Sequence, residues 1–459
     1  MKKLLALLLV ACLTIAMAAC SNNQNNPSSG SDSSGSESSG TTASESSEFP
    51  TEEISLRWSF WASSEEMVYW QSGLDSYTEK HPNVKFTIET TPWSEYWDKL
   101  ATQVASQSQP DITGMTTGTS RMFMANGALL PLNDYMDQAS KDPDSGWSTD
   151  DYWDGVFLGY TLDDKVYGIP YDMGPQALCL NMDLFEEFGV DLPKDGWSID
   201  EAIEIAKKLT VDRDGDGVTD VYGMAWTPDG DYFQEQLVLS LGTEFVSGEE
   251  PNQTVQVSPV TAEFVQKLAD GFKEGWNYDV TAAQDLGLFQ SGQVAMIAAN
   301  PEWFGKYAKL MDNPHLYAMQ APMSGNPEYD TGAKYIAGGG FSIGSNTEYP
   351  DVCWDFLKSY LNEDGVRRCT AEPFRGIPPL KGLLQDFYDS EFAPENVEAL
   401  TYFLTREDAQ NSFYSCPNQN ALREIVNDEL SAVFSGTQTA QEAVDAIVEK
   451  GNKIVKEPE

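Results

Sequence analysis

The most specific chemical motif of the chain is an acidic loop at Asp212–Asp220, with the sequence DRDGDGVTD. Acids occupy its first, third, fifth and ninth positions and glycine its sixth, which matches the first part of an EF-hand calcium loop. The expected oxygen ligands are the side chains of Asp212, Asp214, Asp216 and Asp220 and the main-chain carbonyl of Val218. Gly223 stands at the twelfth position, so a bidentate glutamate would have to come from elsewhere. The motif favours a structural Ca²⁺ site over a solvated acidic turn.

The histidines and the common catalytic motifs give little support to an enzyme. His81 and His315 are the only histidines, both adjoin prolines, and the sequence carries no HExxH or P-loop motif. The 72 acidic residues could include the carboxylate pair of a polysaccharide-cleaving enzyme, but they are too numerous for their presence to discriminate. We predict no catalytic residue and no catalytic cofactor.

The N-terminus has the pattern of a targeting segment. Lys2 and Lys3 precede an apolar stretch, Leu4–Ala16, and small residues precede Cys20. The segment resembles a bacterial lipoprotein signal, which implies a signal peptide over residues 1–19 and a lipid, with palmitate among its acyl chains, on Cys20. An uncleaved membrane anchor is the alternative, although the apolar stretch is short for a spanning helix.

Composition indicates where the mature protein works. Residues 20–52 are rich in Ser and Gly and predict a flexible tether. The formal net charge of −44 argues against nucleic acid as a partner, because phosphates need clustered Lys and Arg, and against direct docking on anionic lipid. We therefore expect a soluble body at the extracellular face of the cell membrane, held there only by its N-terminal lipid.

The folded body begins with a strand–helix–strand pattern. Apolar residues alternate over residues 54–60 and 84–88, which predicts two strands. Between them, Ser63 and Glu66 form a capping box ahead of helical spacing over residues 67–77. This order predicts a βαβ unit and the start of a parallel sheet.

Two more capping boxes predict helices later in the chain. Ser198 pairs with Glu201, and Thr439 pairs with Glu442, each ahead of apolar residues at helical spacing. Gly451 is the expected stop of the last helix.

The four cysteines of the folded body leave two readings open. Cys179, Cys353, Cys369 and Cys416 match neither a CxxC redox motif nor a zinc pattern. They could pair as disulfides outside the cell. The apolar neighbours of Cys179 favour a small buried hydrophobe at that position.

A series of short motifs resembles a known family when the motifs are taken in order. They are SQSQPDI (106–112), NGALLPL (126–132), VYGIP (166–170), LNMDLF (180–185), GWSIDE (196–201), FQSGQVAM (289–296), GGG (338–340) and WDFL (354–357). Each is weak alone. Their order over nearly the whole folded body resembles the extracellular solute-binding proteins of ABC importers (family 1), the branch that includes the maltose-binding protein.

The resemblance implies an α/β, two-lobe periplasmic-binding-protein-like fold of type II. Each lobe is expected to be a mostly parallel sheet flanked by helices, with the ligand cleft between the lobes. The implied boundaries are lobe I at residues 53–168 and 338–381, and lobe II at residues 169–337 and 382–459. The implied crossings fall near Tyr167–Tyr171 and Tyr335–Gly340. The glycines at 338–340 fit a hinge, an ordinary loop or a close backbone approach to ligand.

The same resemblance implies a solute site at the strand ends that face the cleft. A sugar needs aromatic faces and fixed polar groups. The residues predicted to contact the solute are Trp61, Ser63, Glu65, Trp93, Thr116, Thr119, Tyr171, Asp172, Trp226, Asn300, Trp303, Gly339 and Arg375. Relatives carry a Trp, an acid and a basic residue in the loop that corresponds to Thr113–Arg121, where this chain has mostly small polar residues before Arg121, and this departure speaks against maltose itself as the solute.

Several of these residues have a structural alternative. Ser63 could only cap a helix whose dipole Glu65 favours. Trp93 could pack under the next helix, and Trp303 could belong to a lobe core. Arg375 could bind a hydroxyl or carboxylate of the solute, or pair with a surface acid.

The expected function is capture of a mono- or oligosaccharide by lobe closure and delivery to the permease subunits of an ABC importer, by a monomer. Three alternatives stay open: a secreted polysaccharide-acting enzyme, a binder of a non-sugar solute, and an adhesion-type protein. The order of the α/β motifs speaks against the last.

Overall fold

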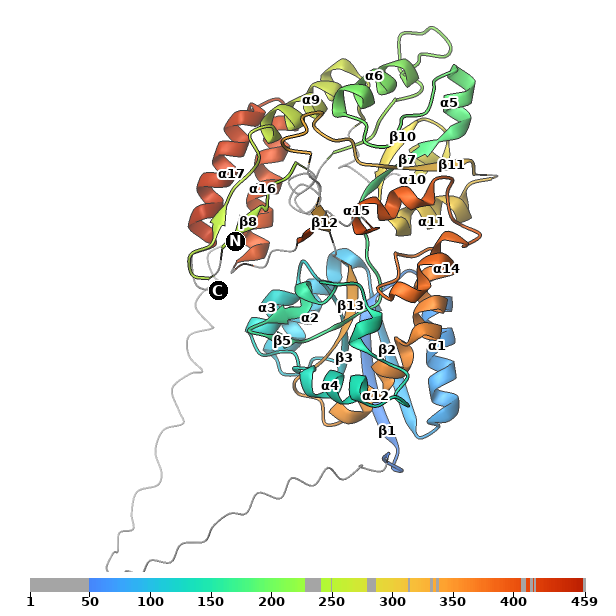
Figure 1. Ribbon diagram of the computed structural model, residues 1–459, viewed down its shortest axis with the longest axis vertical. Coiled ribbons are helices and arrows are strands. Elements are labelled where there is room, and N and C mark those ends of the chain that lie inside the picture. The colour runs from blue at the N-terminus through green and yellow to red at the C-terminus, as the bar shows by residue number, and fades with distance from the viewer. Residues whose placement is uncertain are drawn as a thin grey trace, which may run out of the picture. The chain divides into compact units, whose positions relative to one another are not determined.

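The computed structural model describes the folded body of the chain (Figure 1). The described residues are 49–227, 241–248, 250–278, 286–312, 314–330, 333–335, 338–405, 410–412, 416 and 418–456. Thr51–Glu459 forms one compact unit. The predicted signal peptide, the lipid site at Cys20 and most of the tether lie outside the described residues. Among the residues described, no helix has both the length and the apolar character needed to cross a membrane.

The larger sheet has five strands in the order β2-β1-β3-β13-β6. Its strands are β1 (Ile54–Trp61), β2 (Val84–Thr91), β3 (Ile112–Thr116), β6 (Ile169–Pro170) and β13 (Gly339–Ile343). β1 runs parallel to β2 and β3, whereas β13 runs antiparallel to β3 and β6. A helix joins β1 to β2, which confirms the predicted βαβ unit.

Helices pack on both faces of this sheet (Figure 1). They are α1 (Met67–Lys80), α2 (Trp93–Ala105), α3 (Ser120–Ala125), α4 (Asn133–Lys141), α12 (Pro350–Tyr360), α13 (Glu363–Val366) and α14 (Leu384–Tyr388), with short turns of helix at Thr149–Asp151, Leu158–Tyr160, Arg367–Ala371 and Lys381–Leu383. Trp58 of β1 meets Trp70 of α1 and Phe356 of α12 edge to face. Trp61 points to the other face, because side chains alternate along a strand, and contacts Tyr96 of α2.

The smaller sheet has three strands in the order β10-β7-β11. They are β7 (Ala177–Asn181), β10 (Met296–Ala299) and β11 (Leu316–Gln320). The α/β class is confirmed, but here the direction differs from the expected mostly parallel sheet, since β7 pairs antiparallel with both neighbours. The reason lies in the connections. β10 and β11 are joined by a helix and run the same way, whereas β7 arrives from the larger sheet and runs between them in the opposite direction.

A second set of helices surrounds the smaller sheet (Figure 1). They are α5 (Met182–Phe188), α6 (Ile199–Leu209), α9 (Thr261–Glu274), α10 (Leu286–Gln290), α11 (Pro301–Leu310), α15 (Tyr402–Thr405), α16 (Gln419–Phe434) and α17 (Ala440–Ile454), with a 3₁₀ turn at Val397–Thr401. Short ladders complete the fold: β4 (Thr161–Leu162) with β5 (Lys165–Val166), β8 (Val246–Ser247) with β9 (Thr254–Val255), and β12 (Ala333–Tyr335) with β14 (Gln410–Ser412). Leu180, Trp197, Met224 and Leu430 belong to one continuous core that joins this sheet to its helices.

Three segments connect the two sheets. The first runs from β6 to β7, and the second leads from β11 to β13. The third follows Ile377 and reaches Glu395, which bridges to Tyr317 of β11. Because Ile169 and Pro170 pair with β13, the first connection begins at Tyr171.

The capping boxes are confirmed, but one predicted helix end is wrong. Ser198 with Glu201, and Thr439 with Glu442, make both reciprocal hydrogen bonds. Gly451 does not stop the last helix, because α17 continues to Ile454. A Cβ at Gly451 would lie 3.0 Å from side chains of Leu422 and Val255, so this glycine lets α17 pack closely.

Candidate functional site

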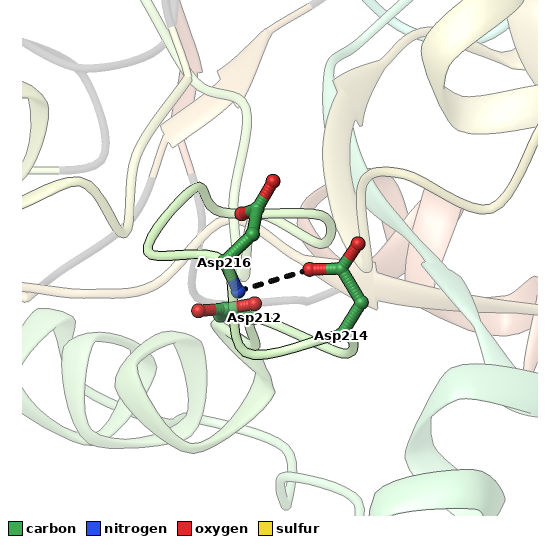
Figure 2. A group of neighbouring side chains, drawn as sticks. All are labelled: Asp212, Asp214 and Asp216. Carbon is green, nitrogen blue, oxygen red and sulfur yellow. Dashed lines mark hydrogen bonds between the residues drawn. The ribbon is translucent and has the colours of Figure 1, made fainter.

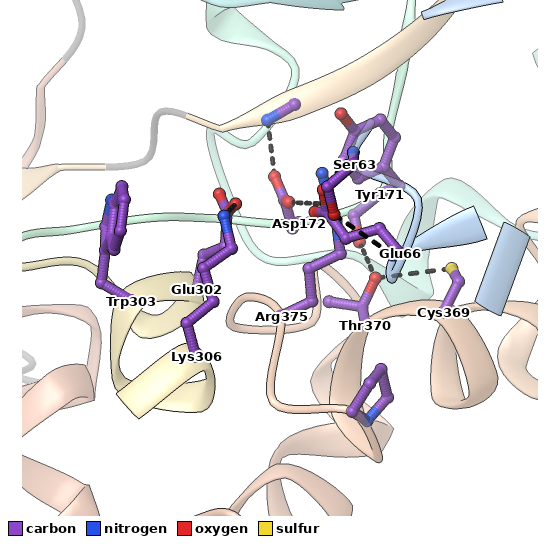
Figure 3. A network of polar contacts seen from close by, with 12 residues as sticks. Ser63, Glu66, Tyr171, Asp172, Glu302, Trp303, Lys306, Cys369, Thr370 and Arg375 are labelled. Atoms are coloured by element: carbon purple, nitrogen blue, oxygen red, sulfur yellow. Dashed lines mark hydrogen bonds and ion pairs between the residues drawn. The ribbon is translucent and has the colours of Figure 1, made fainter. Parts of the chain in front are cut away.

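Arg375 lies at the centre of a buried charge network (Figure 3). Its side chain is 5% exposed, its Nη1 donates to Asp172 Oδ2, and its Nε lies 3.5 Å from Glu66 Oε1. The Ser63 amide donates to Glu66 Oε2 at 2.8 Å, and the Glu66 amide donates to Ser63 Oγ at 3.3 Å. The predicted capping box therefore forms, one turn ahead of α1, and its acid faces Arg375.

Two aromatic rings enclose the same guanidinium. The Arg375 carbon Cζ lies 4.7 Å from the ring centre of Trp70 and 4.8 Å from that of Tyr171. Burial raises the pKa of Tyr171 well above its usual value, although Arg375 acts in the opposite direction. Thr370 Oγ1 donates to the Tyr171 carbonyl at 2.7 Å. These contacts therefore hold the side chain of Arg375 and the main chain of Tyr171 against other residues of the same protein.

Burial and charge oppose each other at the two carboxyl groups of the network. Burial disfavours the charged form of Glu66, but Arg375 and the hydrogen bonds from Ser63 outweigh it, so the pKa of Glu66 lies below its usual value. At Asp172 burial is the larger effect and raises the pKa, against Arg375 and a main-chain amide that lower it. Arg375 keeps its positive charge, since its acidic neighbours raise its pKa against the effect of burial.

The ends of adjacent strands bring further predicted residues to this network. Thr116 of β3 pairs with Gly339 of β13, and the Gly339 amide donates to Asp172 Oδ1 at 2.6 Å. The hydroxyls of Thr116 and Thr119 lie 2.9 Å apart. Trp61 ends β1, the neighbour of β3. Residues from three adjacent strands therefore gather at one end of the larger sheet, where the parallel strands β1 and β3 finish and the antiparallel strand β13 begins.

Three indoles form a cluster at this end of the sheet. The ring of Trp61 stands nearly perpendicular to that of Trp93, with centres 4.9 Å apart, and lies 5.4 Å from the ring of Trp97. Trp93 is 45% exposed, which is unusual for so large an apolar side chain. The alternative that Trp93 is simply buried under α2 is therefore wrong, and the cluster offers an aromatic face to solvent.

The start of α11, the helix that follows β10 of the smaller sheet, supplies further residues (Figure 3). Asn300 caps this helix by accepting the Trp303 amide at 3.1 Å, and its Nδ2 lies 3.9 Å from the position of a Cβ on Gly174. Lys306 donates to Glu302 at 2.5 Å and lies 4.7 Å above the Trp303 ring. Trp303 is partly exposed, so its ring is not a core residue. The helix thus presents an indole, an amide and an ion pair near the first connection between the sheets.

Two predicted residues take no part in the contacts described above. Trp226 is 5% exposed and packs in the core against Phe264, so its burial does not favour contact with a solute. Glu65 is exposed, and the carboxylate that meets Arg375 is its neighbour Glu66.

Sequence reasoning did not single out Glu302, Lys306 or Thr370 as part of the site. Glu302 and Lys306 stand four residues apart on one helix, which is a recognisable pairing signal. Thr370 bonds to the main chain of Tyr171, which lies 199 residues away, so no local pattern could have indicated it.

The acidic loop brings three carboxylates together (Figure 2). Asp212, Asp214 and Asp216 each offer an oxygen within 4.8 Å of the others, and all three are exposed. Asp212 accepts the amides of Gly215 at 2.7 Å and Gly217 at 2.8 Å. The hydrogen bond from Gly217 is the largest of the effects that hold the pKa of Asp212 below its usual value.

The oxygen atoms of this loop suit a hard divalent cation, but Asp220, one of the ligands that the motif implies, is not part of the cluster. Carboxylate oxygens keep lone pairs after accepting an amide, so the three acids can still bind a metal ion. Asp220 is not one of the three clustered carboxylates, and its Oδ2 accepts the Arg213 amide at 2.7 Å. Bridging of Val211 to Val221 closes the base of the loop.

Cys179, Cys353 and Cys369 are buried free thiols, and Cys416 is buried as well. The prediction of a small buried hydrophobe is confirmed for Cys179, which is 0% exposed. Burial raises the pKa of the Cys369 thiol to about 11.

Comparisons with known proteins agree with this geometry. The chain is 24% identical, over 77% of its length and 81% of the relative, to the sn-glycerol-3-phosphate-binding periplasmic protein UgpB of Agrobacterium fabrum. An ABC substrate-binding protein of Listeria monocytogenes, solved in complex with cycloalternan, has a TM-score of 0.74 at 18% identity, covering 88% of this chain and 99% of that one. The GacH receptor of Streptomyces glaucescens, solved unliganded and with acarbose, has a TM-score of 0.71 at 20% identity, covering 89% and 100%.

These structural neighbours share the two-lobe periplasmic-binding-protein fold, so the predicted fold is confirmed. Residues 74–401 match the family described as bacterial extracellular solute-binding protein, a span that includes the smaller sheet, every strand of the larger sheet except β1, and Tyr171, Asp172 and Arg375 of the charge network. The chain therefore belongs to the bacterial extracellular solute-binding protein family.

Proposed function

We propose that this solute-binding protein captures a carbohydrate and delivers it, chemically unchanged, to the permease of an ABC importer. The observation that carries the proposal is the aromatic surface beside the strand ends. Trp93 is 45% exposed on the cluster with Trp61, and Trp303 is partly exposed near the first connection. Flat indole faces suit the apolar C–H face of a pyranose ring. Thr116 and Asn300, both partly exposed, add a hydroxyl and an amide group that can satisfy sugar hydroxyls, while the buried Thr119 bonds to Thr116.

A phosphorylated glycerol is the second candidate solute, because relatives such as UgpB bind sn-glycerol-3-phosphate. A phosphate group needs cations to receive it. In the described network, Arg375 already pairs with Asp172 and Glu66, and Lys306 pairs with Glu302. Both cations therefore already face carboxylates of the protein, which favours a neutral solute.

The mature form and its location are part of the proposal. The lipoprotein-like start of the sequence supports a lipid on Cys20 and a tether over residues 20–52 at the extracellular face of the membrane. The three connections between the sheets support the division into lobe I, at residues 53–168 and 338–381, and lobe II, at residues 169–337 and 382–459, with two changes. Ile169 and Pro170 belong with lobe I because they pair with β13, and α14 stays with lobe I because its Phe387 stacks on Phe374. We take the working unit to be a monomer.

We infer that the loop Asp212–Asp220 holds a structural Ca²⁺. The clustered oxygens of Asp212, Asp214 and Asp216 support this proposal, with the Val218 carbonyl and Asp220 as the further ligands that the motif implies. The ion would stabilise the turn after α6 and would take no part in solute chemistry.

Calorimetry across a panel of sugars and sn-glycerol-3-phosphate tests the proposed function. The purified protein should bind at least one mono- or oligosaccharide, and Trp93→Ala and Trp303→Ala should each weaken binding about tenfold, because a stacking contact contributes on the order of 1 kcal/mol. Tyr329→Ala, which removes an aromatic outside the site, is the control. Binding of the phosphate ester alone, or release of a cleaved sugar during a long incubation, would contradict the proposal.

A further inference from the structure

The three connections between the sheets converge on one carboxylate. Asp172, in the first connection, accepts the Gly339 amide through Oδ1 at 2.6 Å and Arg375 Nη1 through Oδ2. Gly339 begins the strand that follows the second connection, and Arg375 precedes the third. A single side chain of the first connection therefore bonds to the residue that follows the second connection and to one that precedes the third.

Main-chain bonds add to this junction. The Tyr171 amide donates to the Gly339 carbonyl at 2.9 Å, on one side of the first connection. On the other side, Met173 and Ile377 exchange two hydrogen bonds of 2.8 Å and 2.9 Å. The segment at residues 171–173 is thus the central strand of a narrow three-segment ribbon.

The glycines of the ribbon serve close packing. A Cβ on Gly338 would overlap the carbonyl oxygen of Asp172, and one on Gly339 would overlap the hydroxyl of Tyr171. A Cβ on Gly376 would lie 2.5 Å from the Cβ of Asp172. Neither Gly338 nor Gly339 is among the residues with positive φ. Glycine is therefore required at these positions because a side chain would clash, and not because the backbone adopts an unusual conformation. The lack of side chains lets the three segments pack closely.

We propose that Asp172 is a positioning residue, which fixes the register of the three connecting segments and thereby sets how readily the two lobes reach their solute-holding arrangement. The inference rests on the proposed function, but Asp172 acts through Arg375 and Gly339 and not through contact with the solute. Each oxygen of its carboxylate accepts one of these two donors, and Glu66 and the rings of Trp70 and Tyr171 hold Arg375 in place.

Asp172→Asn, which keeps the side-chain shape but removes the charge that holds Arg375, tests this role. If Asp172 positions the lobes, affinity for every solute that the wild type binds falls by one common factor, about tenfold, because only the population of the competent arrangement changes. The order of preference among solutes stays the same. The amides of Gly339, Met173 and Ile377 exchange hydrogen faster in the variant, since their segments are no longer held in register.

A matched control is Asp111→Asn. Asp111 also accepts a main-chain amide, from Arg57 at 2.8 Å, and a second donor, Thr347 Oγ1 at 2.6 Å, but it lies outside the three connecting segments. This variant should lose stability without losing affinity. Arg375→Lys is the second variant, which keeps the charge and tests the same junction if Asp172→Asn does not fold.

Three outcomes would overturn the proposal: a changed order of solute preference, which would make Asp172 a solute contact; an unchanged affinity; or unchanged exchange at the three amides. A wild-type protein that binds no carbohydrate would contradict the proposed function alone, because the exchange measurement still tests the junction.

Discussion

The Arg375 network and the Asp212 loop both bring charged side chains close together, but they differ in burial and in the signs of the charges. In the network, a cation that is 5% exposed meets two carboxylates and two aromatic rings of the same chain. In the loop, three exposed carboxylates gather with main-chain amides as their partners. The first cluster mixes charge signs, whereas the second brings together like charges.

The difference follows from the cost of removing charge from water. A buried ion must find an opposite charge within the protein, because desolvation costs several kcal/mol per ion. Exposed acids keep their hydration, so like charges can stay close until a cation binds. The network is therefore self-sufficient and can position backbone, while the loop is suited to receive an ion from solution. Each of the following predictions probes one side of this contrast.

The largest expected effect comes from removing the central cation. Arg375→Met should lower the free energy of unfolding by about 3–5 kcal/mol, because it leaves Asp172 and Glu66 buried without their partner. Urea unfolding of the two proteins measures the difference. The matched control is Lys141→Met, whose ion pair with Asp137 is 77% and 73% exposed and should contribute less than about 1 kcal/mol. Equal losses in the two variants would remove the distinction between buried and exposed pairs.

The next effect in size concerns the loop and its ion. Calcium at about 100 times its dissociation constant should stabilise the protein by about 2.7 kcal/mol, since only the folded loop presents the clustered oxygens. Thermal unfolding with and without chelator measures the shift. Asp214→Asn with Asp216→Asn should abolish the response to calcium while leaving the sugar affinity unchanged. A shift that persists in this double variant would place the ion elsewhere.

Part of the site and the acidic loop could be predicted from the sequence alone. Trp61, Thr116 and Asp172 were predictable because each follows or ends a strand, and strand ends in this fold meet at one end of the sheet. The loop at Asp212–Asp220 was predictable because its ligands are alternate residues of one turn. In both cases the signal is local or follows from chain order.

What the sequence could not give depends on contacts between distant segments. Glu66 and Arg375 are far apart in the chain, and no spacing rule distinguishes Glu66 from its exposed neighbour Glu65 as the partner. Trp226 was predicted to contact the solute, as Trp303 was, yet it packs against Phe264 in the core. Gly451 resembles a helix stop in the sequence. Its role in the structure is close packing against Leu422, and such packing has no local sequence signature.

The smallest expected effect is the pH dependence of the loop without calcium. The folded-state pKa of Asp212 lies below its usual value of 3.8, mainly because the Gly217 amide bonds to the carboxylate. A lowered pKa means that the stabilisation is fully present above about pH 3.8 and is lost as the pH falls through the folded-state value. The melting temperatures of the wild type and Asp212→Ala, measured in chelator, should therefore differ at neutral pH and converge in acid. Glu66→Gln should show the same sign, because burial raises the pKa of Glu66 but Arg375 and the hydrogen bonds from Ser63 outweigh it and keep this pKa below its usual value. A difference in melting temperature that grows as the pH falls, at either position, would contradict these signs.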